Sequence, residues 1–245
     1  INVSKEIKPN YMQKNALESL DNLRKNNKDK ALLISATGTG KTYLAAFDVK
    51  AVNPKRMLFV VHRRSIAIKA METFKTIIKD KSMGLFSGDN RDIDCDYIFA
   101  TIQTIYKPEN RQLFSKEEFN YIIIDEVHKA GANSYQELVN YFKPQFLLGM
   151  SATPERTDDF DIYKMFDYNI AYEIRLQQAM KYDLLCPFHY YGITDITIDD
   201  QPINDMSDFN LLVDEKRVDY VINKINDYGY SGNHVHGLIF VSRKE

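Results

Sequence analysis

Short runs of apolar residues recur along the first two thirds of the chain, and most show no alternation with polar residues. A strand buried on both faces of a sheet has this pattern, because both of its sides contact the core. Five strands of this type are therefore predicted: Ala31–Ile34, Met57–Val61, Tyr97–Ala100, Tyr121–Ile124 and Phe146–Met150.

Segments with apolar residues at helical spacing separate these runs, and Thr42–Val52 and Ser65–Ile78 are the clearest. Alternating strands and helices indicate a doubly wound α/β domain with a mostly parallel sheet. We expect this domain to occupy residues 1–180.

The pattern changes in the last quarter of the chain. Residues 181–210 contain Pro, Gly and many Asp residues and are predicted to form a linker region, with one strand around His189–Ile193. Val213–Asp227 has the apolar spacing of an amphipathic helix, and Gly237–Val241 resembles another buried strand. Residues 211–245 are therefore predicted to begin a second, incomplete α/β domain.

Composition adds few constraints. Of the 245 residues, 44% are hydrophobic and 27% are charged, which is ordinary for a soluble domain, and the formal net charge is -2. Binding to a nucleic acid would need a local basic patch, because the overall charge gives no attraction to phosphate. No apolar run has the length of a membrane helix, so we expect no membrane partner and a cytoplasmic location.

The segment Ser35–Thr42 follows the first predicted strand and precedes a helix. Glycines allow a tight loop whose amides point at phosphates, and the helix N-terminus adds a favourable dipole. Lys41 can reach the β and γ phosphates of a nucleotide, and the Thr42 hydroxyl can hold Mg²⁺. An exposed surface turn is the alternative, since Ser35 stands where the strict pattern has Gly. The predicted phosphate-binding residues are Ala36, Thr37, Gly38, Thr39, Gly40, Lys41 and Thr42.

Asp125 and Glu126 follow the predicted strand Tyr121–Ile124. Ligands of open α/β sheets bind beyond the carboxyl ends of the strands, which is where these acids fall. Asp125 is suited to bind Mg²⁺, and Glu126 to orient and deprotonate an attacking water. The alternative is a solvated acidic turn.

Three motifs in this order, Ala-Thr-Gly-Thr-Gly-Lys-Thr, Asp-Glu-x-His and Ser-Ala-Thr, each follow a buried strand. Together they resemble motifs I, II and III of superfamily 2 DEAD/DEAH-box helicases, in particular the branch with type III restriction-enzyme motor subunits and UvrB-like proteins. The resemblance implies a RecA-like P-loop fold that uses ATP and Mg²⁺. It adds His128 to Lys41, Asp125 and Glu126 as catalytic residues, and it implies that Ser151 and Thr153 couple hydrolysis to movement.

The same resemblance extends to weaker motifs. Gln13 is similar to the glutamine that reads the adenine edge, although Asn10 stands where the family often has Arg. The segment His62-Arg63-Arg64 resembles motif Ia, and Thr101-Ile102-Gln103-Thr104 resembles motif Ib. In the family, both motifs contact the nucleic-acid backbone. A solvated helix face and a plain helix cap are the alternatives for these residues, which are Arg63, Arg64, Thr101, Gln103 and Thr104.

Leu238–Ser242 resembles motif IV, the first strand of a second RecA-like domain, while motifs V and VI do not follow. Since motif VI carries the arginine finger, we expect the isolated chain to bind ATP weakly and hydrolyse it negligibly. The implied function is an ATP-dependent helicase or translocase, with duplex DNA favoured over RNA and with nuclease or other modules elsewhere in the protein. A different P-loop NTPase and a nucleotide-dependent clamp with little turnover are the alternatives.

Overall fold

The computed structural model describes residues 7–127, 133–154, 161–194, 197–198, 201–202, 215–228 and 237. The chain divides into two compact units, Ile1–Pro187 and Phe188–Glu245, and each is described by itself. The first unit carries the predicted nucleotide-binding motifs.

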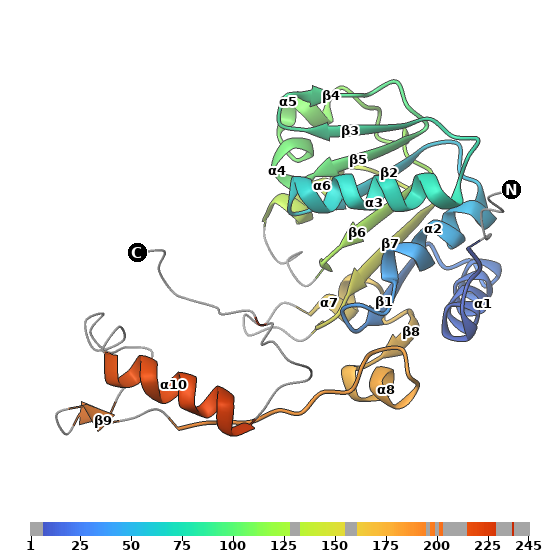
Figure 1. The fold of residues 1–245 in the computed structure, drawn as a ribbon. Helices are drawn as coiled ribbons and strands as arrows, with labels where there is room; N and C mark the ends of the chain where they lie inside the picture. The colour runs from blue at the N-terminus through green and yellow to red at the C-terminus, as the bar shows by residue number, and fades with distance from the viewer. Residues whose placement is uncertain are drawn as a thin grey trace, which may run out of the picture. The chain divides into compact units, whose positions relative to one another are not determined.

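An eight-stranded sheet forms the centre of the first unit, in the order β4-β3-β5-β2-β6-β7-β1-β8 (Figure 1). Every pairing in it is parallel except that of β3 with β4. All five predicted strands are present. The strands are β1 Lys30–Ser35, β2 Met57–Val61, β3 Met83–Ser87, β4 Asn90–Arg91, β5 Tyr97–Thr101, β6 Tyr121–Asp125, β7 Phe146–Ser151 and β8 Ile170–Ile174.

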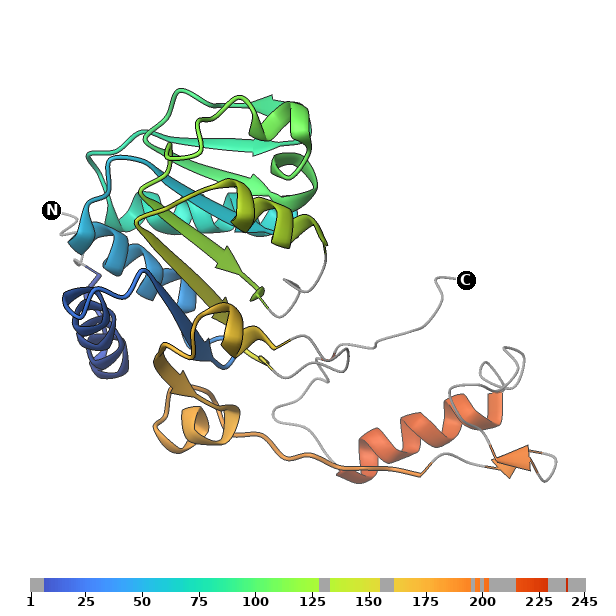
Figure 2. The same cartoon turned by 180° about the vertical axis from the view of Figure 1, so that it is seen from behind.

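Helices cover both faces of this sheet. Figure 1 shows α2 and α3 in front of the strands, and the reverse view in Figure 2 shows α6 and α7 in front. The arrangement confirms the predicted α/β fold. The helices of this unit are α1 Tyr11–Lys25, α2 Lys41–Val52, α3 Arg64–Ile77, α4 Ile102–Ile105, α5 Pro108–Arg111, α6 Asn133–Tyr141, α7 Ile162–Met165 and α8 Leu176–Lys181.

The strand β2 shows why these strands are apolar throughout. All five of its residues are buried. Phe59 and Val61 belong to the core beneath α1, α2 and α3, whereas Leu58 and Val60 belong to the core on the opposite face. Successive side chains point to opposite faces of a strand, so a strand with helices on both sides needs apolar residues at every position.

Several elements were not predicted. The strands β3 and β8 and the helix α1 are absent from the sequence-based interpretation, while the predicted strand at His189–Ile193 is wrong. Residues 189–193 are irregular and exposed, with Tyr190 86% exposed. Among the described residues they have no neighbouring strand and cover no core, so their apolar side chains do not specify a strand. The nearest regular structure is a two-stranded hairpin of β9 Thr197–Ile198 and β10 Gln201–Pro202.

The second unit contains the helix α10, Glu215–Tyr228. This helix confirms the described part of the predicted helix, and none of its residues is buried. The predicted strand at Gly237–Val241 lies outside the described residues except for Gly237. The domain limits at residues 180 and 210 and the second RecA-like domain therefore stay predictions. In the part of the chain that the structure describes, no helix has the length and apolar character needed to cross a bilayer.

Candidate functional site at the carboxyl edge of the sheet

The three strongest motifs follow three neighbouring parallel strands, in the order β6, β7, β1. Asp125, at the end of β6, pairs in register with Met150 of β7. One strand further, Ser151 pairs with Ile34 of β1, directly before the phosphate loop. Parallel strands end at the same edge of a sheet, so the fold brings the acidic pair, the Ser-Ala-Thr turn and the loop together.

The loop between β1 and α2 has the backbone expected for phosphate binding. Gly38 and Gly40 have φ of 88° and 86°, in the left-handed region that favours glycine. Gly40 is also the N-cap of α2, and no side chain caps this helix end. The first-turn amides of α2, a helix of 12 residues, therefore face the loop, which is the arrangement that attracts a phosphate.

Side chains of the loop hold it together from inside. Thr39 donates its hydroxyl to the carbonyl of Ala36 at 2.7 Å and lies 2.5 Å from the Ser35 hydroxyl. The serine that replaces the first glycine of the strict pattern is thus buried and bonded within the loop. The Lys41 ammonium donates to the Ser35 carbonyl at 2.7 Å, which places it over the same loop.

Lys41 and the acidic pair influence one another. Burial lowers the pKa of Lys41, while the negative charges of Asp125 and Glu126 oppose this shift. Asp125 is 8% exposed. Burial, followed by the charge of Glu126, raises the pKa of Asp125 to about 6, against the backbone amide of Glu126 and the charge of Lys41. A cation at the start of α2 and two carboxylates at the end of β6 therefore share one site.

Glu126 has an unusual backbone. Its φ is 54°, a left-handed conformation that few residues other than glycine adopt. Its amide donates to Oδ1 of Asp125 at 3.0 Å. Unusual backbone at the end of a buried strand is common at functional sites, and here it turns the chain sharply after Asp125. His128, predicted to be catalytic, lies outside the described residues.

Gln13 lies beside the phosphate loop, as the adenine-reading hypothesis requires. Its Nε2 donates to the Gly40 carbonyl at 3.3 Å, and its Oε1 accepts from the amide of Asn10 at 3.0 Å. The side chain therefore links the start of α1 to the loop. An adjoining hollow is lined by Met12, Gln13, Ser35, Thr39, Gly40, Lys41, Leu44, Tyr172, Ile174 and Leu184.

The predicted nucleic-acid residues follow β2 and β5, which lie on the other side of β6 from the phosphate loop. His62 and Gln103 are exposed and joined by a contact of 3.0 Å between Nδ1 and Nε2. Arg63 and Arg64 are also exposed, and Arg64 donates to Asn90 at 2.9 Å. These side chains form a polar surface next to the acidic strand end.

The two predicted threonines differ from these exposed residues. Thr101 and Thr104 are buried, and their hydroxyls lie 3.0 Å from each other. Thr101 also donates to Ser87 at 3.0 Å and makes no side-chain cap bond to α4. Their hydroxyls therefore join α4 to β3 within the fold, and the exposed groups at this position come from Gln103.

The Ser-Ala-Thr turn is held by a local bond. The amide of Thr153 donates to the Ser151 hydroxyl at 3.1 Å. Ser151 is buried, whereas Thr153 is exposed. The turn thus presents Thr153 at the surface beside the loop, while Ser151 fixes its shape.

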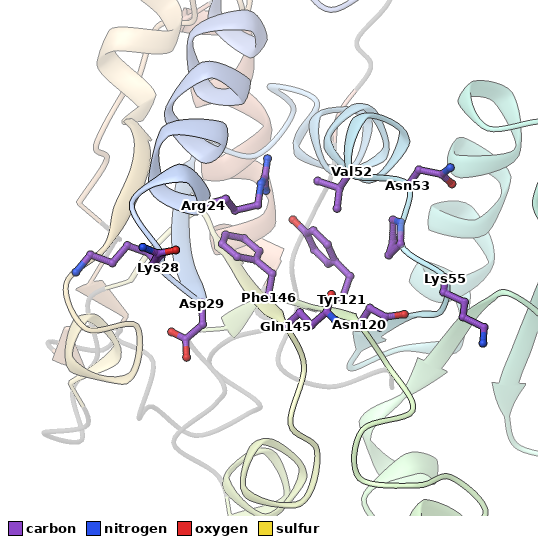
Figure 3. A pocket seen from close by; sticks show the side chains of 12 residues that line it. Arg24, Lys28, Asp29, Val52, Asn53, Lys55, Asn120, Tyr121, Gln145 and Phe146 are labelled. Carbon is purple, nitrogen blue, oxygen red and sulfur yellow. The ribbon is translucent and has the colours of Figure 1, made fainter.

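The opposite edge of the sheet contains a cluster that the sequence did not reveal. Asp48 of α2 is fully buried and receives two bonds from Arg24, at 2.9 and 2.6 Å, and one from the Tyr121 hydroxyl at 2.5 Å. A hollow adjoins this cluster, and Figure 3 shows Lys28 and Lys55 at its two sides, pointing away from its centre. No short motif joins these residues, and Asp48 and Tyr121 are 73 positions apart.

The fold and the order of the motifs define a RecA-like domain of the superfamily 2 helicase type. The family model of the type III restriction enzyme res subunit matches residues 6–156, and the chain belongs to this family. It is 28% identical over 254 residues to the type I restriction enzyme EcoAI endonuclease subunit of Escherichia coli, which covers 90% of this chain and 30% of that protein.

A second relative, from Saccharomyces cerevisiae, has the name "Putative ATP-dependent helicase IRC3". It is 29% identical over 175 residues, which covers 64% of this chain and 25% of that protein. Among solved structures, the nuclease-deletion mutant of the type ISP restriction-modification enzyme LlaGI, in complex with a DNA substrate mimic, matches with a TM-score of 0.57 and 19% identity. The match covers 90% of this chain and 23% of that one. The chain thus spans less than a third of these proteins.

Proposed function

We propose that this chain is the ATP-binding part of a motor that couples ATP hydrolysis to movement along duplex DNA. One observation carries the proposal: the fold brings Lys41, at the start of α2, to the same edge of the sheet as Asp125 and Glu126 at the end of β6. The negative charges of the two acids act on the Lys41 ammonium there. A site for hydrolysing a nucleotide needs such a cation for the phosphates and such acids for the metal and the water.

Lys41 binds the β and γ phosphates together with the amides at the start of α2. Thr42, in the first turn of α2, and Asp125 offer a hydroxyl and a carboxylate, the hard oxygen ligands that Mg²⁺ prefers. The ion would neutralise charge on the transferring phosphoryl group. Glu126 orients the attacking water and accepts its proton, with His128 beside it in sequence. Gln13, fixed against the loop by Gly40, contacts the adenine.

Nucleic acid would bind over the ends of β2 and β5, where His62, Arg63, Arg64 and Gln103 are exposed. Contacts of this kind to the backbone position a protein without reading sequence. Ser151 and Thr153 lie between the loop and the acidic pair along the edge of the sheet, which suits a role in transmitting nucleotide state. Duplex DNA is preferred to RNA because a relative is named as a restriction enzyme and a structural match contains a DNA substrate mimic.

The test is the steady-state ATPase rate of the full-length protein with Mg²⁺, alone and with duplex DNA, single-stranded DNA or RNA. We expect duplex DNA to raise turnover by at least about tenfold, since closing the site around a correctly placed nucleotide lowers the barrier by a few kcal/mol. If RNA alone stimulated turnover, RNA would be the substrate in place of DNA. Tight ATP binding with no stimulated turnover would favour the nucleotide-dependent clamp.

A further inference from the structure

The tyrosine at position 135 has a buried hydroxyl that the fold does not explain. Tyr135 lies on α6, close in sequence to the acidic strand end, and is 2% exposed. Its hydroxyl has no hydrogen-bond partner among the residues that the structure describes. Burying a hydroxyl without a partner costs free energy, and Phe would fill the same space without that cost. An unsatisfied buried group in a native fold therefore calls for an explanation, and a role in a site is one.

The ring of Tyr135 is positioned by the core next to the candidate site. It belongs to the apolar cluster that contains Ile124 and Val127, the two residues that flank Asp125 and Glu126. The same cluster includes Ile102 of α4, against which α6 packs. The aromatic ring thus has a structural role that Phe would also fulfil, and only the hydroxyl is left to explain.

The Tyr135 hydroxyl lies within electrostatic range of the acidic pair. Burial raises the pKa of Tyr135 to about 12, and the negative charges of Asp125 and Glu126 add to the shift. The phenol therefore stays protonated near neutral pH and keeps its hydrogen available for donation.

Asp125 has unused capacity to accept such a bond. It is buried, and the only hydrogen bond to its carboxylate recorded among the described residues comes from the amide of Glu126 to Oδ1. An ionised carboxylate accepts several hydrogen bonds through its two oxygens. Among the described residues, Tyr135 thus has a buried donor without an acceptor. Asp125, whose charge acts on it, has a buried carboxylate with few donors.

We propose that Tyr135 is a positioning residue for motif II, whose hydroxyl donates a hydrogen bond to the Asp125 carboxylate when nucleotide and Mg²⁺ bind. The inference rests on the proposed ATP site. The bond would fix the rotation of the Asp125 carboxylate and so hold it in place as a ligand for the metal. Groups that orient a metal ligand are a recurrent part of metal sites.

The proposal is tested with Tyr135→Phe in the full-length protein, which keeps the ring and removes the hydroxyl. Nucleotide affinity is measured by calorimetry with a non-hydrolysable ATP analogue, once with Mg²⁺ and once with EDTA. We expect affinity with Mg²⁺ to fall about tenfold, the scale of one hydrogen bond to a charged group, and affinity in EDTA to stay unchanged. Duplex-stimulated ATP turnover should fall with it, while the thermal midpoint stays equal or rises.

Tyr141→Phe is the matched control, because Tyr141 lies on the same helix and its hydroxyl donates to the Phe114 carbonyl at 3.1 Å. It should lower the thermal midpoint slightly and leave the Mg²⁺ dependence unchanged. Equal nucleotide affinities of wild type and Tyr135→Phe, both with Mg²⁺ and with EDTA, would overturn this inference and leave the proposed function unaffected. So would a large loss of thermal stability in Tyr135→Phe, which would assign the hydroxyl to the fold. Absence of nucleotide binding by the wild-type protein would overturn the proposed function, and the inference with it.

Discussion

Two clusters of buried charge lie at opposite edges of one sheet, and their hydrogen bonding differs. At the amino edge, Asp48 receives bonds from Arg24 and Tyr121 at 2.5 to 2.9 Å. At the carboxyl edge, Asp125 has a raised pKa and Lys41 a lowered one, because Asp125 is buried and Lys41 half-buried and their desolvation is incompletely compensated. The first arrangement stabilises the fold, whereas the second retains charge that a ligand would neutralise. Strongly perturbed groups gather at functional sites for this reason.

The largest effect on nucleotide affinity should come from Lys41→Ala. It removes the cation over the phosphate loop, and we expect affinity for Mg²⁺·ATP to fall at least about a hundredfold, the scale of two charge-assisted hydrogen bonds. The folded state should keep its stability, because a desolvated ammonium is removed. Calorimetric titration checks the affinity. Lys50→Ala, exposed at the end of the same helix, is the control. Unchanged affinity in Lys41→Ala would contradict the assignment of the loop.

Glu126→Gln should separate binding from chemistry. It keeps the size of the side chain and removes the base, so we expect turnover to fall about 10²- to 10⁴-fold while ATP still binds. The measurement is steady-state ATPase of the full-length protein beside nucleotide binding. The control is Glu137→Gln, a carboxylate on α6 that pairs with Arg111 at 3.0 Å. Turnover within about threefold of wild type would remove Glu126 from the catalytic role.

The difference between the two edges also decides what the sequence could predict. Short motifs after apolar runs encode the carboxyl edge. Phosphate binding needs adjacent residues in one loop, and the two acids need the end of one strand. The positions of Lys41, Asp125 and Glu126 relative to one another followed from the rule that parallel strands end together. The cluster at the amino edge consists of Arg24, Asp48 and Tyr121, which come from α1, α2 and β6. No local sequence pattern predicts such a set.

The same reasoning explains the missed elements. The strand β3 contains Gly84 and Ser87, and β8 has exposed Glu173 near its end, so neither shows the uninterrupted apolar run of a central strand. The segment His189–Ile193 is apolar and aromatic, but no strand in the described part of the chain pairs with it. The burial of Thr101 and Thr104 depends on contacts with β3, which the sequence did not predict.

Asp48→Ala tests the amino edge. It leaves the Arg24 guanidinium, whose side chain is 19% exposed, without its carboxylate. Breaking a buried pair in this way costs about 3 kcal/mol, and the water that reaches Arg24 keeps the loss near that value. Urea denaturation measures it. Asp21→Ala, which removes an exposed pair with Lys25, should change stability very little. If Asp48→Ala lost ATP affinity without losing stability, the two edges would not be independent.

Tyr121→Phe should give the smallest effect and the sharpest comparison. Tyr121 and Tyr135 are 1% and 2% exposed, and the same substitution removes one hydroxyl from each. The Tyr121 hydroxyl is bonded to Asp48, so its loss should lower the unfolding free energy by about 1.5 kcal/mol, whereas Tyr135→Phe should leave the unfolding free energy unchanged.

Burial, with the charge of Asp48, raises the pKa of Tyr121 well above its ordinary value. The contribution of the Tyr121 hydroxyl to the free energy of unfolding is complete below the pKa of an unfolded tyrosine. It is lost as the pH rises toward the pKa of Tyr121 in the folded protein. The stability difference between wild type and Tyr121→Phe should therefore be greatest below about pH 10 and narrow above it. Urea denaturation of wild type and Tyr121→Phe, at about pH 8 and at about pH 10.5, measures the stability difference in each pH range. A difference that does not narrow, or that appears equally in Tyr135→Phe, would show that bonding to Asp48 is not what distinguishes the two tyrosines.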